Sequence, residues 1–415
     1  LAFILNDSGA ETLFFDTGFV ELAEGIGDQT ALRQFVAFGE KDMPRARAYE
    51  TLIADEPASE PAIDPAPDLD TPHIIMYTAG TTGKPKGAIL SQGASFWNAL
   101  NLNLAMDFTS GDRNLLVLPM FHIGGIGLFT LPMIYDGATV VIQRTFEPAQ
   151  TLALLREENI SLFFGVPAIF LALFQHPAFK AEVFKSVRIV MSGGAPLPVS
   201  LVEQYHQAGI ALQQGFGMSE AAPSIATLEK ELALAKAGSI GKPVFHLDAR
   251  IVDDEMHELP AGEVGELVIR GPNLLQGYWK LPDATEKAFS GDWFHTGDLA
   301  RMDADGCLYI VERKKDMFIS GGENVYPAEV ENIIYQLPQI AEAAVIGIKD
   351  PKWGEVGRAV VAVKECRKVT ADEIIDHLHG SLAKYKIPKS VVFIDRLPRN
   401  SAGKVLKNNL REAYS

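Results

Sequence analysis

A stretch near residue 80 combines the residue types that bind phosphate. It reads YTAGTTGKPKG over residues 77–87 and gathers three glycines, three threonines and two lysines. The glycines let the backbone turn and bring N–H groups close to an anion, while the threonines add donors and the lysines add positive charge. It is not a Walker A loop, because Pro85 stands where that motif requires Gly-Lys-Ser/Thr. Taken alone, the stretch predicts either a phosphate-binding loop or an ordinary surface turn.

Short apolar runs, each typical of a buried strand, begin beside this loop and recur along the chain. They alternate with helical patterns and are HIIMYT, NLLVLP, ATVVIQ, SLFFGV, VRIVMSG and IALQQGFG. Near-continuous apolar strands of this kind belong to parallel sheets with helices on both faces. Several of them end in glycine-rich turns, where open α/β sheets bind their ligands. We therefore predict an α/β fold with a site at these turns.

The remaining regions differ in amino-acid composition and in the length of their apolar runs. Residues 43–72 are acidic and rich in proline, so we expect an exposed connecting segment there. From about residue 241 the runs become shorter and strand-like, which predicts a small β-rich subdomain. In the last hundred residues Pro327 suits the first position of a helix, and apolar spacing predicts a second helix around 374–378, with strands between. These elements predict a small α+β unit.

Composition and charge disfavour some classes of partner. The 415 residues include 53 acidic and 37 basic ones, a formal charge of −16, which repels nucleic acid and anionic lipid. The charge reverses between residues 384 and 411, where eight Lys or Arg accompany one acid. That reversal predicts either a surface that meets an anion or a solvated basic tail. Cys307 and Cys366 have no metal-type spacing, which indicates free thiols in a reducing, cytoplasmic compartment.

Residues 114–135 contain no charged side chain and are long enough to span a bilayer. Pro119, Pro132 and several glycines would break a lipid-exposed helix repeatedly. We therefore predict a buried strand, a loop and a helix in this region, and no transmembrane segment. Peripheral contact with a membrane stays open.

Further motifs follow the first loop in a fixed order. They are SGGAP (192–196), GFGMSE (215–220), HTGD (295–298), ERKKDMFISGGENVYPAEVE (312–331) and PRNSAGKVLK (398–407). With them the sequence resembles the adenylate-forming superfamily, in particular acyl-CoA synthetases of the fatty-acid and aryl-acid type, from its first residue to its last. The resemblance implies a large N-terminal domain of parallel α/β sheets with a β-rich subdomain, followed by a small mobile α+β domain. Members normally carry a substantial segment before the part that resembles LAFILNDSGAETLFF, so we expect this chain to lack it.

The resemblance implies a nucleotide site residue by residue. The β- and γ-phosphates of ATP and the leaving pyrophosphate would be wrapped by Thr78, Ala79, Gly80, Thr81, Thr82, Gly83, Lys84 and Lys86. The adenine would stack on the aromatic residue of the run Gly215, Phe216, Gly217, Met218 and Ser219. The close opposite wall would be formed by Gly193, Gly194 and Ala195.

The same resemblance gives roles to three charged residues of the nucleotide site. Asp298 would accept both ribose hydroxyls, with Arg313 beside the ribose and phosphate, and Glu220 would hold Mg²⁺ together with the Thr78 hydroxyl. Ser219 stands where the family often has Thr, and its hydroxyl can still reach a phosphate oxygen. Without the family, Phe216 would be interpreted as core packing and the Asp–Arg pair as a surface ion pair.

The chemistry that the resemblance implies has two halves. A carboxylate has no good leaving group, so enzymes similar to this one first join it to the α-phosphate of ATP, and a thiol then attacks the acyl-adenylate. Lys404 would bridge the substrate carboxylate and the α-phosphate while negative charge grows there.

The second half-reaction is expected to need a rotation of the C-terminal domain. Lys315 occupies the hinge position, which divides the chain into residues 1–314 and 315–415. After rotation, the small residues Gly321 and Gly322 would leave room for the pantetheine arm of CoA.

The acid itself is predicted from the region around His122. Amino-acid-activating relatives carry an aspartate there, and no Asp or Glu occurs from Leu115 to Tyr135, so an α-amino acid is not expected. Gly124 stands where aryl-acid relatives have a bulkier residue, which favours a medium- or long-chain fatty acid. Residues 163–170 (FFGVPAIF) and Met218 would add apolar walls. His122 would gate entry, or would be a hydrogen-bonded core histidine.

The sequence leaves alternatives to an acid–CoA ligase. An adenylate-forming ligase could take an aryl acid, or could pass the acyl group to an amine, a carrier-protein thiol or, as in luciferase-like relatives, oxygen. A nucleotide-binding protein without catalysis is the alternative of another class, and intact Lys404, Glu220 and Asp298 count against it. A homodimer is an open alternative to a monomer.

Overall fold

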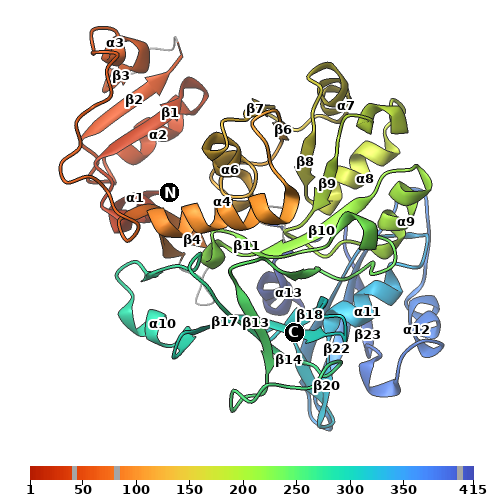
Figure 1. Ribbon diagram of the computed structural model, residues 1–415. Helices are drawn as coiled ribbons and strands as arrows, with labels where there is room; N and C mark the ends of the chain where they lie inside the picture. Colours follow the sequence, from red (N-terminus) through yellow and green to blue (C-terminus); the bar gives the residue numbers. More distant parts are fainter. Residues whose placement is uncertain (40–43, 79–84, 400–404) are drawn as a thin grey trace. The chain divides into compact units, whose positions relative to one another are not determined.

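The computed structural model describes residues 1–39, 44–78, 85–399 and 405–415 (Figure 1). The predicted site residues from Ala79 to Lys84, and Lys404, lie outside this described part. The chain divides into two compact units, which are residues 1–95 with 275–285 (unit 1) and residues 96–274 with 286–415 (unit 2). The predicted boundary at Lys315 stays a prediction.

Unit 1 contains two small sheets. The first is parallel, in the order β1 (Thr12–Asp16), β2 (Gln34–Phe38) and β3 (Ala46–Ala48). Its helices are α1 (Ala2–Ser8), α2 (Val20–Gly27) and α3 (Tyr49–Ile53). The second sheet is antiparallel, in the order β15 (Gly277–Tyr278), β5 (Lys86–Ser91) and β4 (Pro72–Thr78).

Two expectations for unit 1 are corrected. The run HIIMYT is strand β4, but it pairs antiparallel with β5, so its assignment to the parallel sheet is wrong. Only seven residues separate β4 from β5, and a parallel connection needs a dozen or more. The segment expected to be wholly connecting begins with β3 and α3, and only residues 53–70 are continuously exposed.

The central sheet of unit 2 confirms the predicted parallel arrangement. Its order is β12 (Lys242–Pro243), β11 (Ser224–Thr227), β10 (Leu212–Gly217), β9 (Ile189–Ser192), β8 (Leu162–Gly165), β6 (Arg113–Leu116) and β7 (Thr139–Ile142). The strands from β10 to β7 are parallel, and β11 and β12 are antiparallel.

Helices cover both faces of this sheet, as neighbouring side chains of β8 demonstrate. Phe163 packs in one buried cluster with residues of α7 (Pro148–Glu157), α8 (Pro167–Gln175) and α9 (Val199–Gln207). Leu162 packs in the other with residues of α4 (Gln92–Met106) and α6 (Thr130–Tyr135) (Figure 1). The two side chains point to opposite faces because strand residues alternate.

Residues 114–135 form the end of β6, the short helix α5 (Ile123–Ile126) and α6, as predicted. Among the described residues, we find no helix with the length and apolarity needed to cross a membrane.

A second sheet of unit 2 is antiparallel. It has the order β13 (Asp248–Val252), β14 (Gly265–Arg270), β17 (Trp293–Met302) and β16 (Phe289–Ser290), and β18 (Leu308–Arg313) pairs with β17. Helix α10 (Pro282–Glu286) precedes β16. Cys307, next to β18, is buried, whereas Cys366 is exposed in the turn after β22, and both are free thiols.

The C-terminal sheet has the order β20 (Glu323–Val325), β19 (Phe318–Ser320), β22 (Gly354–Val363) and β21 (Ile340–Asp350), with β23 (Ser390–Phe393) beside β22. Helices α11 (Pro327–Ile334) and α12 (Ala371–His379) bury Val330, Ile334 and Ile374 in one cluster, and α13 (Lys407–Tyr414) buries Leu410 in another. Both helices predicted in this region are confirmed.

Candidate functional site

Two glycine turns lie at the carboxyl ends of β9 and β10. A Cβ on Gly193 would lie 2.9 Å from the carbonyl oxygen of Gly215 and 3.2 Å from the ring of Phe164, so only glycine allows this close approach. Gly194 has φ +78°, the left-handed region that favours glycine. The structure therefore brings the predicted wall of Gly193 and Gly194 next to the GFGMSE turn.

The GFGMSE turn reverses the chain from β10 into β11. The Met218 N–H donates to the Pro223 carbonyl at 3.0 Å, and a Cβ on Gly217 would lie 2.2 Å from that same oxygen. Glu220 lies in the 3₁₀ turn Ser219–Ala221 and is only 8% exposed. The turn thus places a carboxylate in a buried position, where it can act as an oxygen ligand for a cation.

Two buried asparagines that sequence reasoning missed hold this turn. Asn98 of α4 donates through Nδ2 to the Gly127 carbonyl at 2.8 Å, and its Oδ1 accepts the Ser224 N–H at 3.1 Å. Asn273 donates through Nδ2 to the carbonyls of Ala221 (2.7 Å) and Ser224 (3.0 Å). An amide within the apolar helical run ASFWNALNLNLAM was the available signal, because buried amides need partners.

Phe216 is half-buried and does not belong to the hydrophobic core. Its interpretation as core packing is therefore wrong. The ring retains an accessible surface on which a planar group can stack.

The pairing of Asp298 with Arg313 is not a surface ion pair. Asp298 is 2% exposed, and its Oδ1 lies 2.7 Å from Nε of Arg313, which is opposite it in the β17–β18 register. The Asp298 N–H also donates to the Thr296 hydroxyl at 3.1 Å. A carboxylate this deeply buried needs its cationic partner, so the Arg313 guanidinium stabilises the Asp298 charge.

His122 caps the short helix α5. Its Nδ1 accepts the Gly124 N–H at 3.1 Å, and surrounding protein desolvates the ring, which lowers the pKa of His122 below its usual range. Because Nδ1 accepts a hydrogen bond, the proton of the neutral ring is on Nε2. A Cβ on Gly124 would lie 3.3 Å from that Nδ1, so the space expected at Gly124 is limited by the histidine itself.

The apolar walls expected from residues 163–170 are only partly available. Phe163 and Phe170 are fully buried in the core cluster. Phe164 and Val166 are partly buried and lie against Gly193 and Gly194, respectively.

In unit 1, the structure describes the two ends of the predicted phosphate loop. Thr78 and Lys86 are opposite each other in the β4–β5 register, and the Thr78 hydroxyl donates to the Lys86 carbonyl at 3.4 Å. The Lys86 ammonium lies 5.2 Å from the centre of the Tyr278 ring, a cation–π distance. The Tyr77 hydroxyl donates to the Asp7 carboxylate at 2.6 Å. These contacts fix both ends of the loop.

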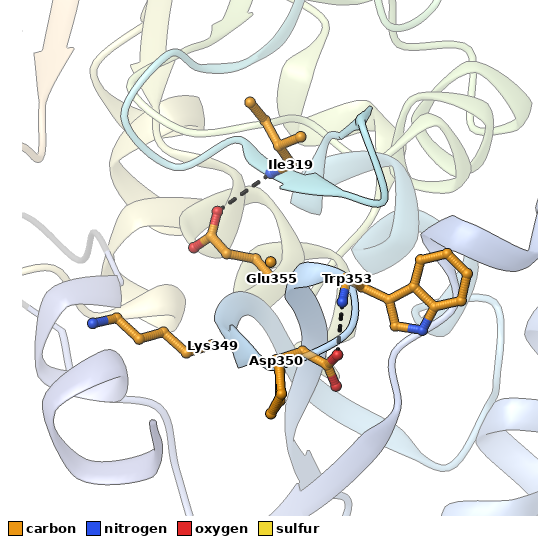
Figure 2. A pocket seen from close by; sticks show the side chains of 7 residues that line it. Ile319, Lys349, Asp350, Trp353 and Glu355 are labelled. Carbon is orange, nitrogen blue, oxygen red and sulfur yellow. Dashed lines mark hydrogen bonds between the residues drawn. The ribbon is translucent and has the colours of Figure 1, made fainter.

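The C-terminal part presents Lys315 and the Gly321–Gly322 turn. All three residues are exposed, and both glycines have positive φ. A Cβ on Gly321 would lie 2.7 Å from the Trp353 indole, so this glycine is packed against that ring, whereas Gly322 is open. A pocket lies beside this turn, and its labelled side chains are seen in Figure 2. Its lining is Ile319, Lys349, Asp350, Pro351, Trp353, Gly354 and Glu355.

Four of the seven described basic residues between 384 and 411 form ion pairs with carboxylates. The pairs are Lys386–Glu329, Arg399–Glu342, Lys407–Glu331 and Arg411–Asp316, at 2.6 to 2.8 Å. The expectation of an anion-binding surface or a solvated tail is therefore wrong for these four. Their charge serves internal contacts.

Comparisons with known proteins agree with this arrangement. Residues 1–279 match the family model of the AMP-binding enzyme, and residues 329–404 match the AMP-binding enzyme C-terminal domain. A feruloyl-CoA synthase of Amycolatopsis sp is 40% identical over 410 residues, which cover 99% of this chain and 80% of that protein. A long-chain-fatty-acid–CoA ligase of Mycobacterium tuberculosis is 37% identical over 415 residues, 100% of this chain and 81% of that protein.

A solved structure is similar over nearly the whole chain. It is the o-succinylbenzoate CoA synthetase of Bacillus subtilis in complex with ATP and magnesium ion. Its TM-score is 0.85 at 34% identity, covering 99% of this chain and 81% of that one.

The fold, the two glycine turns and the similarity to known CoA ligases together define the class of the protein. The chain belongs to the AMP-binding enzyme family, whose members form adenylates. Within that family it is an ATP-dependent, AMP-forming acyl-CoA synthetase, and ATP and CoA are its substrates.

Proposed function

We propose that this enzyme activates an apolar monocarboxylic acid and transfers the acyl group to CoA. A carboxylate oxygen of the acid attacks the α-phosphorus of ATP, a new O–P bond forms, and the bond to the bridging oxygen of the leaving pyrophosphate breaks. The CoA thiolate then attacks the acyl carbon, a C–S bond forms, and AMP leaves with the carboxyl oxygen. The observation that carries the proposal is the pair of glycine turns at the carboxyl ends of β9 and β10, with buried Glu220 in the second.

Each group of the nucleotide is assigned to its own residues. Phe216 stacks on adenine, and the Asp298 carboxylate, oriented by Arg313, accepts ribose hydroxyls. Thr78 and Lys86 flank the phosphate loop. Glu220 and Thr78 offer carboxylate and hydroxyl oxygens, the donors that Mg²⁺ prefers, and the ion would neutralise phosphate charge. A similar structure contains ATP and magnesium, which supports this assignment.

Lys404 is proposed as the catalytic cation of the first half-reaction. An ammonium shared by the substrate carboxylate and the α-phosphate reduces their repulsion as the oxygen approaches phosphorus. The second half-reaction is proposed to follow rotation about Lys315, with CoA entering beside Gly321 and Gly322. The pocket next to these glycines supports that proposal.

The first candidate acid is a medium- or long-chain fatty acid. Residues 114–135 contain no Asp, Glu, Lys or Arg, so no carboxylate or ammonium in this stretch pairs with a second charge on the substrate. A fatty-acid–CoA ligase is among the similar proteins.

The second candidate is an aryl acid. A feruloyl-CoA synthase is 40% identical to this chain, and the His122 ring limits the space at Gly124 that favoured an alkyl chain. A flat aromatic acid needs less depth than a long alkyl chain.

A substrate panel tests both candidates. Dodecanoate, palmitate and ferulate are each incubated with MgATP, and pyrophosphate release is measured with CoA, with an amine and without acceptor. We expect release that depends on the acid and thioester formation only with CoA; ferulate turning over faster than both fatty acids would reject the first candidate.

Two variants test the catalytic assignment. Lys404→Ala should abolish acid-dependent release, whereas Lys185→Ala, an exposed lysine outside the motifs, should not. Equal activity in both variants would contradict the role of Lys404. If the unaltered chain binds ATP but turns over none of the acids, the result would favour the non-catalytic alternative.

A cytoplasmic location, with the two separate thiols as its support, is also proposed. Association into a homodimer stays a prediction.

A further inference from the structure

A buried ammonium lies at the start of the last helix, where no role has been assigned. Lys407 is the first residue of α13, and 14% of its side chain is exposed. Its Nζ lies 2.8 Å from Oε1 of Glu331 and 3.8 Å from Oε2 of Glu312. Burial opposes the charge, but the two carboxylates outweigh it and hold the pKa of Lys407 above its usual range.

Each of these carboxylates is itself anchored to backbone. Glu312, at the end of β18, accepts the N–H of Ala328 at the start of α11 at 2.8 Å. Glu331 of α11 accepts the N–H of Val345 in β21 at 2.7 Å. The ammonium therefore joins α13 to β18, α11 and β21 through fixed acceptors.

The chain just before Lys407 is held at both sides of residues 400–404. Arg399 and Val405 form an antiparallel bridge, and the Leu406 N–H donates to the Pro398 carbonyl at 2.8 Å. Arg399 also pairs with Glu342 of β21 at 2.6 Å. The residues that flank this segment are thus tied to each other, and Arg399 is tied to the C-terminal sheet.

Lys407 is the first charged side chain after this segment, three residues beyond Lys404 in the sequence, and Val405 between them packs against the apolar cluster that contains Leu410. We propose that Lys407 is a positioning residue for adenylation: its buried ammonium, held by Glu331 and Glu312, fixes the chain from which Lys404 reaches the substrate carboxylate and the α-phosphate. This inference rests on the proposed role of Lys404. Because Lys404 acts in the first half-reaction, loss of Lys407 impairs acyl-adenylate formation selectively.

The test separates the two half-reactions in the full chain. Acid-dependent ATP–pyrophosphate exchange measures adenylation, and release of AMP from synthetic acyl-adenylate with CoA measures thioester formation. The acid is dodecanoate or ferulate, whichever the unaltered enzyme activates faster. Lys407→Met should lower exchange about 30-fold or more and leave thioester formation within about threefold. Lys407→Arg, which keeps the cation, should restore most of the exchange.

A matched control distinguishes positioning from general instability. Lys236 is likewise shared by two carboxylates, Asp303 at 2.8 Å and Asp305 at 2.6 Å, and lies in none of the motifs. Lys236→Met should lower the Tm without changing the ratio of the two rates. Equal losses in both half-reactions for Lys407→Met, or no loss in either, would overturn the proposal.

Two further variants, Glu331→Gln and Lys404→Ala, are measured in the same assays. If Lys407→Met does not fold, Glu331→Gln must give the same selective loss, and an unselective loss there overturns the proposal. Lys404→Ala is measured alongside: if it retains exchange, the role of Lys404 and this inference fail together. If it loses exchange while Lys407→Met is unselective, only the inference fails.

Discussion

Replacing Asn98 with alanine should weaken both the fold and nucleotide activation. Its amide serves two buried backbone groups, the carbonyl of Gly127 and the N–H of Ser224, at 2.8 and 3.1 Å. The residue is 1% exposed, so water cannot replace the lost partners. Each unsatisfied buried group costs about 1 to 3 kcal/mol, which predicts a loss of about 2 to 6 kcal/mol in the free energy of unfolding.

The same change should reach the site, because Ser224 ends the turn that carries Glu220. Misplacing a turn of this kind by a fraction of an ångström lowers rates by about tenfold to a hundredfold. Urea unfolding gives the stability, and acid-dependent ATP–pyrophosphate exchange gives the KM for ATP and the maximal rate.

Asn101 provides the matched control on the same helix. It is equally buried, its Oδ1 accepts only the His246 N–H at 2.9 Å, and its Nδ2 has no partner among the described residues. Asn101→Ala removes one bond and one unsatisfied donor, so we expect a loss of about 0 to 2 kcal/mol and an unchanged KM for ATP. Equal effects of the two variants on stability and KM would refute this reasoning.

Three further predictions follow from the site. Arg313→Met should lower the free energy of unfolding, measured with urea, by about 3 to 5 kcal/mol, because it leaves the Asp298 charge buried without its cation. A loss below about 1 kcal/mol would contradict that reason. Gly193→Ala should lower the Tm and raise the KM for ATP, because its methyl group would meet the Gly215 carbonyl, and an unchanged Tm would speak against the close approach. The pKa of His122 is lower in the folded chain than the ordinary value of about 6.5, so its stability contribution is complete above that pH and is lost as the pH falls toward the folded pKa. His122→Asn keeps a capping acceptor that does not titrate. Between pH 7.5 and 5.5, the free energy of unfolding of this variant should therefore fall less steeply than that of the unaltered chain. Parallel pH profiles would reject the assignment.

The parts of the fold that sequence predicted are those that local pattern determines. Apolar runs identified β6 to β10, and Pro327 with helical spacing identified α11. The run HIIMYT has the same pattern of apolar residues, but its pairing partner is set by the short connection to β5 and not by its own residues. A hydrophobic pattern predicts that a strand is buried, and it does not predict which strand lies beside it.

The contacts that sequence could not predict join distant positions. Asn98 meets Ser224, and Lys407 meets Glu331, across 126 and 76 residues of chain. A lysine followed by polar neighbours has the pattern of a solvated helix end, and only the tertiary structure buries Lys407. Motif resemblance identified candidate ligands such as Asp298, but the side chains that hold them carry no motif.

The contrast between the two cysteines makes the C-terminal part accessible to a spectroscopic reporter. Burial raises the pKa of Cys307 and shields its sulfur, while Cys366 is exposed in the turn that follows β22. A maleimide fluorophore should therefore attach at one position without any engineered mutation. Its anisotropy would test the proposed reorientation about Lys315 while ATP, acid and CoA are added in turn.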